Sequence, residues 1–282
     1  MDWTELQDII HIKIRNKKPL AGGDISTVYQ LETHQGNFVI KINEIHEADM
    51  LDKESRNLKI LANTGVIRVP KVVDSGTIGK DEFLLLENIP QGVANEKTFR
   101  EFGEQLAALH KITNNRFGLD YHNYIGSLFQ SNLEHELWHN FYWYERIRPQ
   151  FVLAVNQGFY DDKIIENEKQ ILNVFQENFE DCPPVLLHGD LWNGNFVIDI
   201  NSHAVVLDPA VYFGHPAMDI AMTRLFGGFP EDFYQSYFAN STCKFSNSAI
   251  ELAQLYYLLV HLNLFGKSYL GKVNSILNKY IL

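Results

Sequence analysis

The stretch from residue 188 to residue 208 constrains the fold of this chain more than any other. His188 and Gly189 precede Asp190, an asparagine follows at position 195, and a second aspartate stands at position 208 after apolar, strand-like segments. Phosphoryl transfer from a magnesium nucleotide requires one aspartate to accept a proton, and an asparagine and a second aspartate to bind metal ions. The spacing is that of the loop H-x-D-x-x-x-x-N followed by a metal-binding aspartate at a strand end. The pattern therefore predicts a kinase-type catalytic loop.

Each side chain of this loop has a predicted role. Asp190 is the predicted general base, and Asn195 and Asp208 are the predicted magnesium ligands, because hard oxygen donors suit that ion. His188 is expected to order the loop by hydrogen bonding rather than to transfer protons. The alternative is an ordinary turn rich in aspartate and asparagine, which the agreement of spacing and context disfavours.

Composition limits the class of protein and its partners. The chain has 282 residues, 45% of them hydrophobic, which suffices for one large or two modest domains and excludes global disorder. A net charge of −11 argues against nucleic acid or an anionic membrane as the main partner. The most apolar stretch, residues 250–265, contains polar side chains and is expected to be a buried helix rather than a membrane span.

The cysteine content and the N-terminus indicate a location. Cys182 and Cys243 are the only cysteines, which is too few for a disulfide framework or a zinc cluster, and no motif surrounds them, so both are expected to be structural. The N-terminus has no signal-peptide core. We expect a cytoplasmic protein that is a monomer.

Strand-like segments dominate the first ninety residues. Residues 27–31 and 37–42 flank a turn and predict a hairpin, and residues 69–74 and 82–87 predict two further strands. Residues 47–62 have the apolar spacing of a helix. The sequence Pro90-Gln91-Gly92 then interrupts the pattern and is expected to mark a lobe junction.

Helix-like segments dominate the rest of the chain. They are predicted over residues 96–112, 134–157, 162–179, 216–226, 231–239 and 246–281, the last broken near Gly266 or Gly271. The fold class predicted from this order is α+β, with two lobes as in protein kinases. A small β-rich lobe, residues 1–89, is expected to bind the nucleotide, and a larger and mainly helical lobe, residues 90–282, is expected to hold the catalytic and substrate residues.

Two residues of the first lobe are predicted to serve the nucleotide. Lys41 ends the strand-like segment 38–41, as does the V-A-I-K lysine that holds the α- and β-phosphates. Glu54 lies on the following predicted helix and could pair with it. The alternatives are a solvent-facing lysine and an exposed acid that pairs with Lys53 or Arg56. The order of both residues ahead of the catalytic loop favours the functional interpretation.

Two further segments are expected to contact ATP. Gly22-Gly23 and Ser26 occupy the position of a glycine-rich phosphate loop, although the pattern is not G-x-G-x-x-G and a plain loop is the alternative. Backbone N–H groups or the Ser26 hydroxyl are expected to contact a phosphate. Glu87-Asn88-Ile89 falls where an adenine-binding hinge belongs, and backbone groups there would bind the base.

With these residues placed, the chain resembles the fructosamine kinase (ketosamine kinase) family, which is related to aminoglycoside phosphotransferases and choline kinases. The resemblance runs over nearly the whole length, and Trp192, two places after Asp190, is typical of this family within the superfamily. Its other marks include Gly22-Gly23-Asp24-Ile25, Asn123-Tyr124-Ile125-Gly126, Asp208-Pro209-Ala210, Tyr212-Phe213-Gly214-His215, Asp219-Ile220-Ala221 and His261-Leu262-Asn263. The resemblance implies a protein-kinase-like fold and transfer of the ATP γ-phosphate, with Mg²⁺, to a sugar hydroxyl of a ketosamine. It also links the chain with protein deglycation, because the phosphorylated adduct is unstable.

The acceptor residues are less constrained by sequence. Trp192 could stack on the apolar face of a sugar, and core packing beneath the loop is an equal alternative. His215 is a candidate substrate residue by resemblance. Asp219 is expected to accept hydrogen bonds from the backbone of the catalytic loop rather than to touch the substrate.

Three other functions compete with a ketosamine kinase. An aminoglycoside or other small-metabolite phosphotransferase would share the fold. A protein kinase is disfavoured because Gly189 replaces the arginine of H-R-D, and Asp219 comes too soon after Asp208 for an activation loop. A nucleotide-binding pseudokinase module would have lost Lys41 or a catalytic-loop residue, and these are all present. Fructose-, ribose- and erythrose-derived adducts, free or on a protein, remain alternative acceptors.

Overall fold

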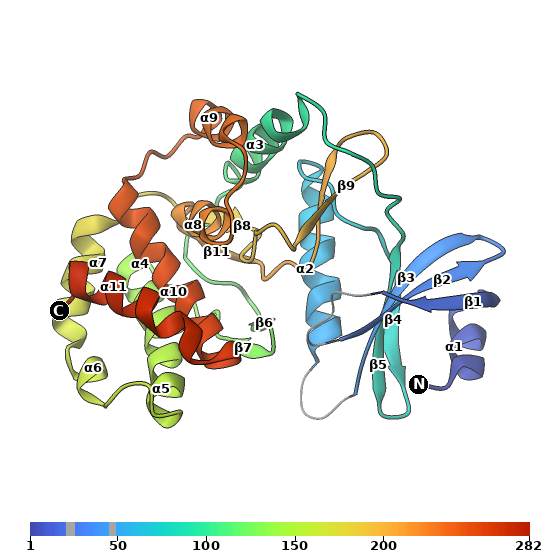
Figure 1. Cartoon of the computed structure of the whole chain (residues 1–282), viewed down its shortest axis with the longest axis horizontal. Helices are drawn as coiled ribbons and strands as arrows, with labels where there is room; N and C mark the ends of the chain where they lie inside the picture. Colours follow the sequence, from blue (N-terminus) through green and yellow to red (C-terminus); the bar gives the residue numbers. More distant parts are fainter. Residues whose placement is uncertain (21–25, 45–48) are drawn as a thin grey trace. The chain divides into compact units, whose positions relative to one another are not determined.

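The structure, a computed structural model, describes residues 1–20, 26–44 and 49–282 (Figure 1). It divides into two compact units. The first unit comprises Met1–Thr98 and Phe196–Pro209, and the second comprises Phe99–Asn195 and Ala210–Leu282. The lobe junction that we place at residue 90 stays a prediction.

The first unit contains a five-stranded antiparallel sheet in the order β1-β2-β3-β5-β4. Its elements are α1 (Trp3–Ile10), β1 (Ile14–Pro19), β2 (Thr27–Thr33), β3 (Gly36–Glu44), α2 (Met50–Thr64), β4 (Val72–Ile78) and β5 (Asp81–Glu87). The predicted hairpin is confirmed as β2 and β3, and the predicted helix as α2. α1 and β1 were not predicted, although Asp2 is a standard N-cap whose carboxylate accepts from the Thr4 amide at 2.8 Å.

Because side chains alternate along a strand, the two faces of this sheet pack against different helices. Successive side chains of a strand point to opposite faces. Ile40 and Ile42 of β3 join the apolar cluster that holds Leu6 and Ile10 of α1. Lys41 between them therefore points to the other face. Figure 1 shows α1 and α2 on opposite sides of the sheet, so this second face is the one that α2 covers.

A later hairpin completes the first unit. It consists of β9 (Phe196–Ile198) and β10 (Ala204–Val206). The Gly92 amide donates to the Ile198 carbonyl at 2.8 Å, and the Val206 amide donates to the Arg68 carbonyl at 2.9 Å. These backbone bonds attach residues from the catalytic stretch to the first unit, and Asp208 follows directly.

The second unit is mainly helical, as predicted for this part of the chain. Its helices are α3 (Thr98–Leu109), α4 (Trp138–Phe141), a π-helical turn (Tyr142–Ile147), α5 (Arg148–Asn156), α6 (Lys163–Glu166), α7 (Glu168–Asn178), α8 (Ala217–Leu225), α9 (Glu231–Asn240), α10 (Asn247–Phe265) and α11 (Leu270–Tyr280). Its short strands pair as β6 (Asn123–Ile125) with β7 (Leu128–Gln130), and β8 (Val185–Leu187) with β11 (Tyr212–Gly214). The α+β fold class is confirmed.

α10 is the central helix of this unit. It packs against α5, α8 and α11, and most of its side chains are buried on every side. The predicted break is confirmed at Gly266, which has a φ of 86° that suits glycine. In the part of the chain that the structure describes, no helix has both the length and the apolar character needed to cross a membrane.

Candidate active site

Lys41 is the centre of an ion-pair cluster in the first unit. Its Nζ lies 2.8 Å from Oε1 of Glu54 and 2.5 Å from Oδ1 of Asp208. Because Lys41 points to the α2 face of the sheet, the Glu54 side chain on α2 can reach it. The side chains of Lys41 and Glu54 are 12% and 16% exposed, whereas that of Asp208 is 48% exposed. The predicted Lys41–Glu54 pair is present, and we call these three residues the ion-pair cluster.

Burial and charge act in opposite directions within this cluster. Burial would lower the pKa of Lys41, but the carboxylates of Asp208 and Glu54 outweigh it and raise that pKa above its usual value. Burial raises the pKa of Glu54 to about 7; Lys41 opposes the shift and Asp208 adds to it. Because one ammonium group is shared by two carboxylates, the negative charge of Glu54 is only partly compensated.

Asp208 has the features of a metal ligand within this unit. Its φ of 52° lies in the left-handed region, and the Asn57 side chain fixes the following residue by donating to the Pro209 carbonyl at 2.7 Å. One carboxylate oxygen faces Lys41, and nearly half of the side chain is exposed. A partly exposed carboxylate is a suitable oxygen donor for Mg²⁺.

The predicted hinge lies at the end of β5. Glu87 forms an ion pair with Arg68 at 3.1 Å, and the Asn88 side chain accepts from Gln30 at 2.8 Å. Ile89 is partly buried. Next to the hinge, a shallow hollow of about 290 Å³ is lined by Gln91, Gly92, Phe196, Val197 and Ile198. Ser26 immediately precedes β2, and the predicted contacts of Gly22 and Gly23 lie outside the described residues.

The predicted catalytic loop, residues 188–195, lies in the second unit and is anchored by a buried aspartate. β8 ends at Leu187, and Asp219 on α8 then accepts from the amide of His188 at 2.8 Å and of Gly189 at 2.9 Å. Nε2 of His110 donates to the same carboxylate at 3.1 Å, and the Tyr237 hydroxyl lies 2.8 Å from its Nδ1. The geometry agrees with the backbone-bonding role expected of Asp219.

The charge of Asp219 is stabilised although the side chain is fully buried. Burial would raise the pKa of Asp219, but the hydrogen bond and charge of His110, with the loop amides, outweigh it and lower that pKa. The carboxylate is therefore ionised at neutral pH. A charged acceptor forms stronger hydrogen bonds than a neutral one, which fixes the start of the catalytic loop.

Asp190 and Asn195 are brought together within this loop. Nδ2 of Asn195 donates to the backbone oxygen of Asp190 and to its Oδ2, both at 2.9 Å. Because the amide nitrogen of Asn195 is the donor in both bonds, its Oδ1 is left as the atom that can coordinate a cation. Asp190 is partly exposed and Asn195 is 7% exposed. The asparagine thereby orients the aspartate.

The surroundings of Gly189 explain why a glycine stands where H-R-D has an arginine. Its φ is 85°, and a Cβ built there would meet the Ala210 carbonyl oxygen at 2.0 Å. The Ala210 amide in turn donates to the His188 carbonyl at 2.9 Å. On α10, the buried Tyr257 hydroxyl donates to the Gly189 carbonyl at 3.0 Å. Any larger residue at position 189 would force these segments apart.

Trp192 belongs to a partly exposed aromatic cluster. Its ring centroid lies 5.8 Å from that of Phe226, which in turn lies 4.5 Å from the His261 ring. His261 also contacts Phe265, which is 53% exposed, and Tyr269. Trp192 itself packs against Gly194, where an added Cβ would meet its ring. These five aromatic rings form a surface next to the catalytic loop.

His215, the candidate substrate residue by resemblance, lies inside the second unit. It is fully buried among the rings of Trp138, Phe179 and Phe245. Its Nδ1 accepts from the Ala217 amide at 3.1 Å, and its Nε2 lies 3.2 Å from the Glu180 carbonyl oxygen. Burial lowers its pKa to about 3. His215 therefore has no exposed surface, and its assignment to the acceptor stays a prediction.

Three supporting residues were missed by sequence reasoning. His110, Tyr237 and Tyr257 contact Asp219, His110 and Gly189 respectively, across 109, 127 and 68 positions of the chain. No local motif marks them. The one usable signal is their polar character inside otherwise apolar helical segments, because a buried polar group needs a partner.

The chain matches known proteins over almost its whole length. The family model described as fructosamine kinase matches residues 3–282. A protein of Vibrio parahaemolyticus described as a probable ketoamine kinase is 36% identical over 280 residues, which cover 97% of this chain and 95% of the relative. A chloroplastic protein-ribulosamine 3-kinase of Arabidopsis thaliana is 33% identical over 268 residues, covering 93% and 81%.

Solved structures agree. A crystal structure of a Haemophilus somnus protein described as a putative fructosamine-3-kinase superposes with a TM-score of 0.91 at 27% identity, covering 99% of this chain and 98% of that one. An aminoglycoside phosphotransferase in a ternary complex with AMP-PNP and hygromycin B reaches a TM-score of 0.61 at 17% identity, covering 98% and 97%, and so shares the fold alone. The chain has a protein-kinase-like fold, is a phosphotransferase that acts on hydroxyl groups, and belongs to the fructosamine kinase family.

Proposed function

We propose that this kinase transfers the γ-phosphate of ATP to a sugar hydroxyl of a ketosamine, with Asp190 as the general base. The observation that carries the proposal is the anchored loop: Asp219 holds its backbone, and Asn195 orients the Asp190 carboxylate. Such an anchored carboxylate can receive the proton of a hydroxyl group that is placed against it.

The protein contributes to this reaction mainly by positioning the reacting groups. As the acceptor oxygen bonds to the γ-phosphorus, the bond from that phosphorus to the ADP oxygen breaks, and the hydroxyl proton passes to Asp190. The transition state is loose, so the base positions the hydroxyl and accepts its proton late. Asn195 serves this step by fixing the carboxylate that it contacts at 2.9 Å.

Magnesium fits the donor atoms that the chain offers. Oδ1 of Asn195 and the carboxylate of Asp208 are hard oxygen donors and are our proposed ligands. The ion would neutralise the charge on the phosphates. Lys41 is proposed to bind the α- and β-phosphates, with Glu54 orienting its ammonium group at 2.8 Å.

The remaining nucleotide contacts come from the first unit. We propose that Gly22, Gly23 and Ser26 contact the phosphates, and that the backbone of Glu87-Asn88-Ile89 binds adenine. The hollow beside this hinge is lined by apolar Phe196, Val197 and Ile198, which suits the face of a purine. ATP as donor is supported by the family and by the AMP-PNP bound to an aminoglycoside phosphotransferase of the same fold.

The aromatic cluster is the proposed acceptor surface. Trp192 lies two positions after Asp190, and an aromatic face can pack on the apolar face of a sugar. A protonated ketosamine amine is also a cation that aromatic rings attract. A ketosamine acceptor is favoured over an aminoglycoside because the ketoamine kinase relative is 36% identical, against 17% for the aminoglycoside phosphotransferase. A monomer in the cytoplasm remains part of the proposal.

An acceptor panel tests this function. ADP release with magnesium ATP would be measured against fructosamine, ribulosamine, aminoglycoside and choline acceptors at matched concentrations. We expect turnover with one of the ketosamines and none with choline. Turnover confined to aminoglycosides would replace the proposal, and tight nucleotide binding without any turnover would favour a binding module.

Three variants test the proposed roles of Asp190 and Trp192. Asp190→Ala is expected to lower kcat at least about 10²-fold while nucleotide affinity is retained, because the base acts in the chemical step. Asp190→Asn is the matched control, since it keeps the size of the side chain and removes only the proton acceptor. Trp192→Ala is expected to raise the KM for the ketosamine and to leave the KM for ATP unchanged. Near-normal turnover of either Asp190 variant would refute the base assignment.

A further inference from the structure

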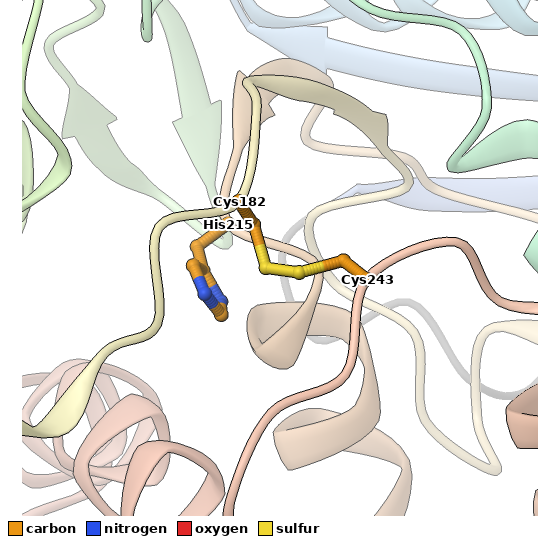
Figure 2. Close-up of side chains that lie close together, drawn as sticks. All are labelled: Cys182, His215 and Cys243. Carbon is orange, nitrogen blue, oxygen red and sulfur yellow. A yellow bond between two sulfur atoms is a disulfide. The ribbon is translucent and has the colours of Figure 1, made fainter.

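Cys182 and Cys243 form a disulfide in the second unit, across 61 positions of the chain (Figure 2). Cys182 is 3% exposed and lies between α7 and β8, whereas Cys243 is partly exposed and lies between α9 and α10. The sequence pattern predicts structural cysteines but gives no sign of their pairing. Neither cysteine has a role in the proposed catalytic chemistry.

The disulfide bond joins two segments of the second unit. One leads directly into the catalytic loop, and the other connects two helices whose side chains support that loop. From Cys182 the chain runs through Pro183 and Pro184 into β8 and then to the loop, and prolines make this link stiff. On the other side, α9 carries Tyr237, which contacts His110 and through it the Asp219 anchor. α10 carries Tyr257, which donates to the Gly189 carbonyl.

A polar contact runs parallel to the disulfide. The Ser246 amide, at the N-cap of α10, donates to Oε1 of Glu180 at 2.7 Å, and the Cys182 amide donates to the Glu180 carbonyl at 2.8 Å. The two segments thus remain in contact when the disulfide is reduced. Reduction is therefore expected to loosen the catalytic loop rather than to unfold the unit.

A metal site is the competing explanation for this cluster. The sulfurs and one His215 nitrogen lie within 4.8 Å of one another, which is compatible with a three-ligand site. However, the sulfurs are bonded to each other (Figure 2), and both His215 nitrogens already have hydrogen-bonding partners at the Ala217 amide and the Glu180 carbonyl. The geometry favours a thiol–disulfide couple over a metal centre.

We propose that Cys182 and Cys243 are a reversible redox couple whose disulfide form holds the catalytic loop in place and thereby raises the turnover of the kinase. The oxidant is a low-molecular-weight disulfide. The Cys243 thiolate, which is the more exposed, attacks one of its sulfurs and releases a first thiol; Cys182 then attacks the Cys243 sulfur and releases a second. Two protein thiols thus become one disulfide, and one small disulfide becomes two thiols.

The redox state of the surrounding compartment would determine which form of this couple is present. Disulfides are rare in a reducing cytoplasm, where those that form are usually transient or redox-sensing. A reduced chain there would turn over slowly, and a shift toward oxidising conditions would raise the turnover. The proposal rests on the proposed kinase function for its activity readout, but not for its structural readouts.

The test compares the full chain after treatment with oxidised glutathione and after treatment with dithiothreitol. The oxidised form is expected to have a kcat about two- to five-fold higher, because the loop is better positioned. Its Tm should be about 5–10 °C higher, since the crosslink restricts the unfolded chain. Cys243→Ser is the matched variant: its kcat and Tm should equal those of the reduced wild type and should not respond to either reagent.

Hydrogen exchange gives a readout that is independent of the acceptor. Amides of residues 186–190 should exchange more slowly in the oxidised form, including in the Asp190→Ala variant, whose turnover is expected to be strongly lowered. If no acceptor supports turnover, the proposed function fails while slowed exchange still supports the crosslink. Equal exchange and equal kcat in the two forms would overturn the proposal. Thiols that oxidised glutathione does not consume, or one equivalent of zinc retained by the reduced chain, would overturn it as well.

Discussion

The ion-pair cluster of the first unit and the catalytic loop of the second are held in different ways. Lys41 is fixed by two carboxylates, one of which, Asp208, is 48% exposed. The catalytic loop is fixed by bonds to its backbone from Asp219 and Tyr257, both of which are fully buried. Backbone bonds in a buried setting are shielded from salt and solvent, whereas pairs that reach the surface are weakened by both.

This difference separates two tasks. A cluster of charges can exchange a carboxylate partner for a phosphate, which suits the proposed nucleotide site. A loop held by its backbone keeps its geometry whatever is bound, which suits the proposed general base. We therefore expect substitutions in the cluster to act on nucleotide binding, and substitutions behind the loop to act on turnover.

Replacement of Lys41 should have the largest effect. Lys41→Met removes the ammonium group and keeps much of the apolar stem. The value of kcat/KM for ATP is expected to fall about 10²-fold, because the charge-assisted hydrogen bonds that we propose between Lys41 and the phosphates are lost. Steady-state kinetics with varied ATP measures this. Lys53→Met is the control, because Lys53 pairs with Asp49 at 2.7 Å and contacts neither Glu54 nor Asp208 in an ion pair that the described residues show.

Replacement of Asp219 should separate turnover from binding. Asp219→Asn keeps the shape, but its amide nitrogen cannot accept a hydrogen bond from a loop amide. We expect kcat to fall about 10-fold with the KM for ATP unchanged, since a small shift of a catalytic loop is costly. Stopped-flow measurement of phosphoryl transfer and nucleotide titration would check both. A large rise in the ATP dissociation constant would break the contrast between the two regions.

Acidification is expected to act on the ion-pair cluster through Glu54. Burial raises the pKa of Glu54 to about 7, so Glu54 is charged above pH 7 and loses its pairing with Lys41 below it. We expect kcat/KM for ATP to fall about 3- to 10-fold from pH 8 to pH 6, with an apparent pKa near that value. In the Glu54→Gln variant, kcat/KM for ATP should no longer change between pH 8 and pH 6. It should stay at the low value even at high pH.

The same shift has a consequence for stability. The pKa of Glu54 is higher in the folded chain than in the unfolded chain, so the folded state holds its proton more tightly. Stability contributed by Glu54 is therefore complete below the unfolded pKa and is lost as the pH rises through about 7. At pH 8, Glu54→Gln should raise Tm while it lowers activity. If the Tm of Glu54→Gln at pH 8 is lower than that of the wild type, the predicted direction of the effect on stability is wrong.

The sequence predicts those parts of the site that are encoded locally. The spacing of Asp190 and Asn195 within one loop, and of Lys41 at the end of a strand, reflects contacts over a few residues. Hairpin β2–β3 and the break at Gly266 were predicted for the same reason, because turn and positive-φ chemistry lies in the residues themselves.

The supports of the site arise from tertiary packing instead. The His110–Asp219 contact and the Cys182–Cys243 bond join residues 109 and 61 positions apart. Nothing in the local sequence selects one distant partner over another, because the choice depends on how the helices pack. His215 illustrates the converse: its neighbourhood resembles a functional motif, yet Trp138, Phe179 and Phe245 enclose it.

Removal of one hydroxyl should have the smallest effect and should test the role of the backbone most directly. Tyr257→Phe deletes the bond to the Gly189 carbonyl and leaves that oxygen buried without this donor. The cost in unfolding free energy is expected to be about 1–3 kcal/mol. Part of this lost free energy should appear as a kcat lower by about 2- to 5-fold, because Gly189 lies near the start of the loop.

The control for this variant is another buried tyrosine with the same chemistry. Tyr142 donates to the Leu252 carbonyl at 2.6 Å and makes no hydrogen bond to the catalytic loop among those the described residues show. Tyr142→Phe should therefore lose similar stability in a urea titration and keep its kcat. If both variants lose kcat equally, then general loosening of the second unit, rather than the hold on Gly189, governs turnover, and the contrast between a charge-held and a backbone-held region loses its functional meaning.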